Sequence, residues 1–220
     1  MDPAHVPAGK RVKPTLRGVF HELGFYAALG LGVPLVLTAH DVRARTAAAI
    51  FAVCVAACLG TSALYHRPNW KPSVRGWLAR LDHVGVYLLI AASYVPFGLL
   101  VMSRGWAVTL LGLVWGGALA AILCRLVWPR APKGLWAGIA LGLGWVGAAA
   151  LPQLTKVDLP GILLVVAGGL LYTAGAIVYL AKRPDPMPRV FGYHELFHLL
   201  TLGAIGCQYG SIAFFVLPRG

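Results

Sequence analysis

The sequence predicts an all-α integral membrane protein, a bundle of seven transmembrane helices. Of its 220 residues, 59% are hydrophobic and only 12% are charged, and the mean hydropathy is +0.75, which excludes an ordinary soluble domain. Charge-free apolar runs recur along the chain, each close to the ~20 residues that a helix needs to cross ~30 Å of hydrocarbon. These runs are too long and too uniformly apolar for the roughly ten-residue alternating strands of a membrane barrel.

Each predicted span is one such run. In chain order the spans are residues 23–39, 46–65, 84–103, 105–124, 134–155, 159–181 and 199–218. The first run is longer than the about 7–15 apolar residues of a signal peptide, and Leu37 and Ala39 make a poor cleavage site, so we expect a retained span. The loops are short, so we predict one domain at residues 17–220 after a cytoplasmic tail at residues 1–16.

The basic residues predict the orientation of the bundle. With the N-terminus in the cytoplasm, 14 of the 19 Lys and Arg residues lie on the inside. The five on the outside are Arg43, Arg45, Arg104, Lys156 and Arg219. This bias predicts a multi-pass protein of the plasma membrane with its C-terminus outside. The basic loops would face anionic lipid headgroups, so the net charge of +12 requires no nucleic-acid partner. The sequence predicts no particular oligomeric state.

Two histidines open the last apolar stretch. His194 and His198 are four residues apart, so on a helix they share one face at a separation of roughly 6 Å and can both reach one zinc ion. Titratable side chains are costly inside a membrane, so their presence in a span is a hypothesis of function.

The predicted topology gathers further polar residues in the same leaflet. Span two ends at the cytoplasmic side, and spans one, three and seven begin there. The residues that these ends bring to one depth are His21, Glu22, Ser62, His66, Asp82, His83, His194, Glu195 and His198.

A zinc site is the chemistry that this set predicts. Three imidazoles, from His66, His194 and His198, would leave a fourth position open, which is the pattern of a catalytic site. Zinc lowers the pKa of a bound water to about 7. Asp82, at the mouth of span three, is the predicted base for that water. Ser62, one turn from His66, is predicted to hydrogen-bond the water or a substrate carbonyl.

The other polar residues of this leaflet are expected to act indirectly. His21 and His83 are predicted to make interhelical contacts or to support the ligands. Glu22 is expected to pair with a cytoplasmic arginine. Glu195 is rotated by about 100° from the histidine face, so we expect it to snorkel or to support the ligands.

Several short motifs resemble those of the hemolysin III family, the bacterial branch of the progestin and adipoQ receptors. They are residues 17–21 (RGVFH), 62–66 (SALYH), 81–83 (LDH), 94–96 (YVP), 175–179 (GAIVY) and 191–198 (FGYHELFH). The resemblance implies seven spans, zinc on His66, His194 and His198, and a site completed by Ser62 and Asp82. Many relatives have histidine where this chain has Gln208. That position is about 15 Å along the helix from His198 and cannot share its metal.

Three function classes follow from these patterns and from the family resemblance, which alone implies the ceramidase-like character of the first. The first is a zinc-dependent, ceramidase-like hydrolase of a lipid amide or ester, with a membrane lipid as substrate or ligand and zinc-activated water. The second is a non-catalytic membrane sensor or homeostasis factor with a structural zinc. The third is an intramembrane metalloprotease with Glu195 as base. It is disfavoured because such enzymes take an acidic third ligand from a later helix, and none follows span seven.

Overall fold

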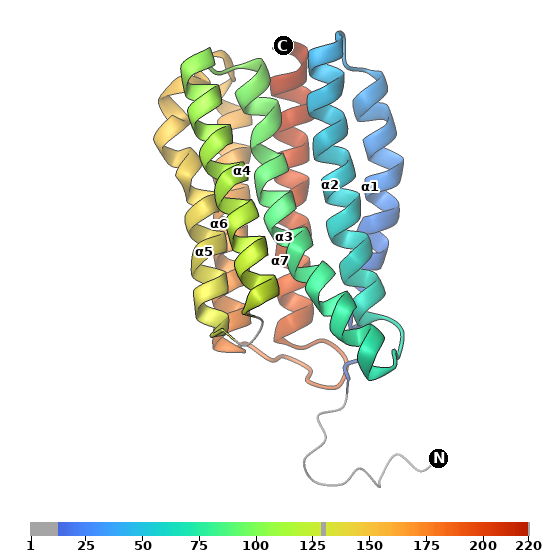
Figure 1. Ribbon diagram of the computed structural model, residues 1–220. Coiled ribbons are helices and arrows are strands. Elements are labelled where there is room, and N and C mark those ends of the chain that lie inside the picture. The colour runs from blue at the N-terminus through green and yellow to red at the C-terminus, as the bar shows by residue number, and fades with distance from the viewer. Residues whose placement is uncertain (1–12, 129–130, 220) are drawn as a thin grey trace, which may run out of the picture.

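The computed structural model describes residues 13–128 and 131–219, and in this part of the chain seven helices are long and apolar enough to cross a membrane (Figure 1). The helices are α1 (Val19–Leu37), α2 (Val42–His66), α3 (Pro72–Leu100), α4 (Arg104–Val127), α5 (Lys133–Trp145), α6 (Leu159–Ala181) and α7 (Tyr193–Ser211). The prediction of a seven-helix membrane bundle is confirmed.

Neighbouring helices in the chain are mostly neighbours in space. The pairs α1 and α2, α2 and α3, α3 and α4, and α6 and α7 pack along their lengths. The helix α7 packs against α6 and also contacts α1, so the two ends of the chain close the bundle; in Figure 1 it is seen behind α2 and α3. This closure brings the end of α2 beside the start of α7.

Two helices begin well before the predicted spans. The helix α3 starts at Pro72 rather than residue 84, and α7 starts at Tyr193 rather than residue 199. A charge-free run marks only the apolar part of a helix. The backbone hydrogen bonds of the helix can continue into flanking polar residues, provided that their side chains find partners. Asp82 therefore lies inside α3 and not at its mouth, which corrects the predicted placement.

Two spans also change helix type near the opposite end of the bundle. The fifth span is α-helical only to Trp145 and continues as a 3₁₀ helix over Val146–Lys156. Pro152 lies inside this segment, where a proline removes a backbone donor and clashes with an α-helical turn. The helix α7 continues as a π segment, Ile212–Val216, and a 3₁₀ turn, Leu217–Arg219.

The end of the predicted cytoplasmic tail contacts the bundle. The backbone N–H groups of Thr15 and Leu16 donate to the carbonyls of Arg189 and Val190, in the loop between α6 and α7. Residues 1–12 of the tail lie outside the described residues. The division into a tail and a single domain stays a prediction.

Candidate metal centre

Three histidines converge at one end of the bundle. His66 is the last residue of α2, and His194 and His198 lie in the first two turns of α7. The Nε2 atoms of His66 and His194 are 3.2 Å apart, and one ring nitrogen from each of the three lies within 4.8 Å of the others. Two nitrogens bound to one tetrahedral zinc at 2.0–2.1 Å would be about 3.3 Å apart. The triad therefore has the dimensions of a site for a single metal ion.

The hydrogen bonding around the triad fits a metal as well. His198 is only 2% exposed, and its Nδ1 atom has no hydrogen-bond partner among the described residues. Buried polar atoms without partners are rare in folded proteins and call for a bound water or ion. Neutral imidazole is a good ligand for several transition metals, so the donor set does not by itself choose zinc.

The start of α1 supports the triad from one side. Gly18 has φ +80°, and a Cβ atom at this position would lie 2.7 Å from the Cβ of His66. Only glycine combines that conformation with so close an approach. One turn on, the His21 ring stacks on His198 with 3.7 Å between ring centroids and 6° between planes. His21 therefore contacts another helix, but by ring stacking and not by the hydrogen bond expected of such a histidine: neither of its ring nitrogens has a hydrogen-bond partner among the described residues.

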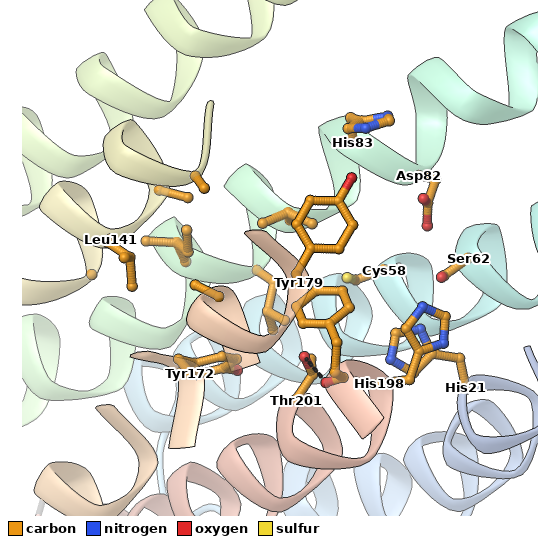
Figure 2. A pocket seen from close by; sticks show the side chains of 18 of the residues that line it. His21, Cys58, Ser62, Asp82, His83, Leu141, Tyr172, Tyr179, His198 and Thr201 are labelled. Atoms are coloured by element: carbon orange, nitrogen blue, oxygen red, sulfur yellow. Dashed lines mark hydrogen bonds between the residues drawn. The ribbon is translucent and has the colours of Figure 1, made fainter. Parts of the chain in front are cut away.

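Asp82 and Ser62 lie beside the triad. The Asp82 Oδ2 atom is 3.8 Å from His66 Nε2, and Ser62 is buried one turn before His66 on α2. Figure 2 shows both side chains on the same side of the stacked His21 and His198 rings. The fold thus brings all five predicted site residues together, from α2, α3 and α7. Their roles as ligands, base and hydrogen-bonding group stay predictions.

Glu195 does not snorkel, contrary to the first of the two roles expected for it. It is 1% exposed, and its Oε1 atom accepts a 2.5 Å hydrogen bond from the Arg17 Nε. Its Oε2 atom accepts from the backbone N–H of Gly192 at 2.9 Å, so it caps α7. Both carboxylate oxygens are engaged away from the triad. This arrangement argues against Glu195 as the base of a metalloprotease.

The remaining polar residues have separate partners. Glu22 pairs with Arg67 at 2.7 Å, so the predicted pairing with an arginine is confirmed. A ring nitrogen of His83 contacts the Ala79 carbonyl of its own helix, and Figure 2 shows this ring apart from the His21 and His198 rings. His83 is therefore not a member of the triad.

A large cavity adjoins the triad inside the bundle. Its volume is about 1280 Å³, which exceeds the roughly 300–1,000 Å³ of ordinary small-molecule sites. The triad, Asp82 and Ser62 line one part of it. Apolar side chains such as Leu141, Leu151 and Val165, from the fifth span and α6, line another. Figure 2 shows Leu141 on the far side of the cavity from the His198 ring. The triad's surroundings are therefore accessible to a ligand with a long apolar part.

Sequence reasoning missed two residues that shape this site. Arg17 holds Glu195 and so fixes the start of α7. The Tyr179 ring, on α6, lies 5.9 Å from the His194 ring and 5.2 Å from that of Phe197. Arg17 belongs to the motif at residues 17–21 and Tyr179 to the one at residues 175–179, but a motif does not reveal which helix its side chains contact.

The fold and this geometry define a seven-helix, multi-pass membrane protein with a candidate three-histidine metal site at one end of the bundle. Residues 10–209 match the sequence model of the family described as Haemolysin-III related, so the chain belongs to the haemolysin III family.

Named relatives agree with this assignment. The chain is 30% identical to Hemolysin-3 of Bacillus cereus over 89% of each protein. It is 28% identical to the Hemolysin-3 homolog of Bacillus subtilis (strain 168), over 76% of this chain and 75% of that protein. It is also 25% identical to the Adiponectin receptor protein of Drosophila melanogaster, over 90% of this chain but 50% of that protein. These similarities are consistent with the wider progestin and adipoQ receptor superfamily.

Proposed function

We propose that this protein is a zinc-dependent hydrolase that cleaves an ester or amide bond of a membrane lipid. The observation that carries the proposal is the junction of the histidine triad and Asp82 with a large, partly apolar cavity inside the bundle. We further propose that the triad lies on the cytoplasmic side of the plasma membrane, as the distribution of basic residues predicts.

The chain would supply binding, orientation and proton transfer. Zinc, when bound by the three imidazoles, supplies a Lewis acid and activates water. Asp82 would accept a proton from the attacking water and return it to the leaving alcohol or amine. The acyl C–O or C–N bond breaks as the water oxygen bonds to the carbonyl carbon, giving a carboxylic acid and the alcohol or amine. Ser62 would orient the carbonyl or the water by a hydrogen bond.

One observation favours a second candidate, a non-catalytic sensor or homeostasis factor. The triad joins α2 to α7, and the pairs of Arg17 with Glu195 and Glu22 with Arg67 fasten the same end of the bundle. A metal here would add a third fastening and could serve structure alone.

An Asp82→Asn variant separates the two candidates. We expect it to retain about one zinc per chain, since the three imidazoles remain, and to lose lipid hydrolysis by about 10²-fold or more, the usual scale for a general base. His194→Ala and His198→Ala should each lose most of the zinc because two imidazoles hold the ion far more weakly. Elemental analysis of purified protein measures the metal, and release of fatty acid from extracted membrane lipids measures the reaction.

Asp158→Asn, at the opposite end of the bundle, is the matched control and should leave both readouts unchanged. If the wild type releases no fatty acid, or if Asp82→Asn is as active as the wild type, the hydrolase proposal fails. Retention of zinc in both histidine variants would overturn the ligand assignment.

A further inference from the structure

The mouth of the cavity carries a marked excess of positive charge. Seven basic side chains line the cavity, against two acidic ones, Asp82 and Asp185. Arg17, one of the seven, is paired with Glu195. In the described parts of the chain no carboxylate lies within 4.0 Å of Lys13, Arg75 or Lys133, although each lines the same cavity.

These three cations are held in place by contacts that leave their charge uncompensated. The Arg75 guanidinium lies over the Tyr65 ring, 5.0 Å from its centroid. The Lys133 amine lies 5.7 Å from the centroid of the Tyr179 ring. The Lys13 amine donates to the Arg67 carbonyl at 2.8 Å. Such contacts orient a cation without neutralising it, so all three remain able to bind an anion.

The same aromatic rings connect the cations to the candidate metal site. The Tyr65 ring lies 4.5 Å from the His66 ring, and the Tyr179 ring lies 5.9 Å from the His194 ring. Arg75 and Lys133 are thus each separated from a triad histidine by a single aromatic ring. An anionic group held between them would lie next to the metal site and beside the apolar part of the cavity.

The general excess of basic residues on the cytoplasmic side of membrane proteins explains charged loops. It does not require cations to gather around one cavity. Here partial burial and the neighbouring Arg75, Arg67 and Arg17 guanidinium groups lower the pKa of the Lys13 amine below its ordinary value. The neighbouring guanidinium groups therefore disfavour the charged form of the Lys13 amine, and an anion bound beside it would relieve that repulsion.

We propose that the cavity mouth binds the phosphate of an anionic lipid through Lys13, Arg75 and Lys133, so that the lipid handled at the metal site is a phospholipid and not a neutral lipid. The inference rests on the proposed lipid function of the cavity. The headgroup phosphate contacts the three cations, and the apolar cavity takes an acyl chain. Phosphate is the favoured anion because three cations without a carboxylate partner line one cavity, which suits a group with several acceptor oxygens.

Direct binding tests this assignment without any need for turnover. The probes are radiolabelled dioctanoyl phosphatidic acid and dioctanoylglycerol, which share their acyl chains and differ in the phosphate. Binding is measured on detergent-solubilised Asp82→Asn protein, so that hydrolysis does not intervene. We expect the phosphatidic acid to bind at least about tenfold more tightly than the neutral lipid, and this preference to shrink at high salt.

Two triple variants with the same change in net charge supply the comparison. Replacing Lys13, Arg75 and Lys133 by glutamine should abolish the preference for phosphatidic acid. Replacing Arg43, Arg104 and Lys156 by glutamine, at the opposite end of the bundle, should leave it within about twofold. If the glutamine triple variant does not fold, a charge-keeping variant, K13R/R75K/K133R, replaces it. This variant should retain most of the binding of phosphatidic acid.

Several outcomes would overturn the proposal. Equal binding of the two lipids by Asp82→Asn protein that keeps Lys13, Arg75 and Lys133 would show that no phosphate site exists. An equal loss in the two glutamine variants would reduce the effect to general attraction between charges. Displacement of the lipid by inorganic phosphate at equal concentration would assign the site to the free anion. Failure of the hydrolase proposal alone would leave the lipid preference intact, so the two failures are distinguishable.

Discussion

At the scale of single residues, burial separates two ion pairs of similar length. Arg17 and Glu195 lie 2.5 Å apart, with side chains 23% and 0% exposed. Arg67 and Glu22 lie 2.7 Å apart, with side chains 42% and 36% exposed. Both pairs fasten the end of the bundle that holds the triad. Water screens the exposed pair far more strongly, so the two contributions to stability should differ.

Glutamine substitution measures this difference. Glu195→Gln removes the charge that faces a partly buried guanidinium, and we expect a loss of about 2 kcal/mol or more in the free energy of unfolding. Glu22→Gln, the matched control, should cost at most about 1 kcal/mol. Both variants should keep their zinc because neither carboxylate belongs to the triad. Denaturant unfolding in one detergent provides the measurement, and equal losses would contradict the role of burial.

At the scale of helices, the sequence predicts the number and order of spans because each run of apolar residues must be buried in lipid or protein. The span at residues 159–181 coincides with α6. The helix α3 shows where this reasoning stops. Its polar first turns carry Asp82 and belong to the helix, so apolar composition alone does not mark where the helix begins.

The candidate site was predictable to a similar degree. Spacing places His194 and His198 on one face, and topology brings His66 to their depth. The stacking of His21 on His198 and the Arg17 pair depend on how α1 packs against α2 and α7, and no pattern within a single segment contains that information. The cavity depends on all these contacts together.

The close approach of α2 and α3 gives a prediction at this scale. A Cβ atom on Gly85 would lie 3.0 Å from the Cα of Cys58 on the facing helix, while one on Gly76, in the same helix, would meet nothing within 4 Å. Gly85→Ala should therefore push α3 from α2 and cost about 1–3 kcal/mol. Gly76→Ala should be neutral or stabilising by up to about 1 kcal/mol.

Zinc content gives a second readout of the same pair of variants. Because Asp82 sits three residues before Gly85, displacement of α3 should move Asp82 away from His66, which belongs to α2. The triad itself lies on α2 and α7, so zinc should remain in Gly85→Ala while hydrolysis falls. Equal stability of the two alanine variants would show that α2 and α3 are free to separate at no cost.

At the scale of the whole molecule, the described chain starts and finishes at opposite ends of the bundle (Figure 1). Thr15 bonds to the loop before α7, and Arg219 pairs with Asp158, which precedes α6 at the other end. The triad and the basic cavity mouth lie at the end where the described chain starts. The orientation of the bundle therefore decides from which leaflet a lipid headgroup reaches the triad and the cavity mouth.

The bias of basic residues predicts that this end faces the cytoplasm. Alkaline phosphatase, which folds only outside the cytoplasm, should thus be active when fused after the last residue of the chain. The same reporter fused after residue 182, beyond six spans, should be inactive, and a green fluorescent protein at that position should fluoresce. The two fusion sites control for each other, because only the seventh span separates them and they should therefore lie on opposite sides of the membrane. The reverse pattern would place the triad in the outer leaflet, so that the phosphate-binding mouth would meet outer-leaflet lipids. The proposal of hydrolysis on the cytoplasmic side would then be wrong.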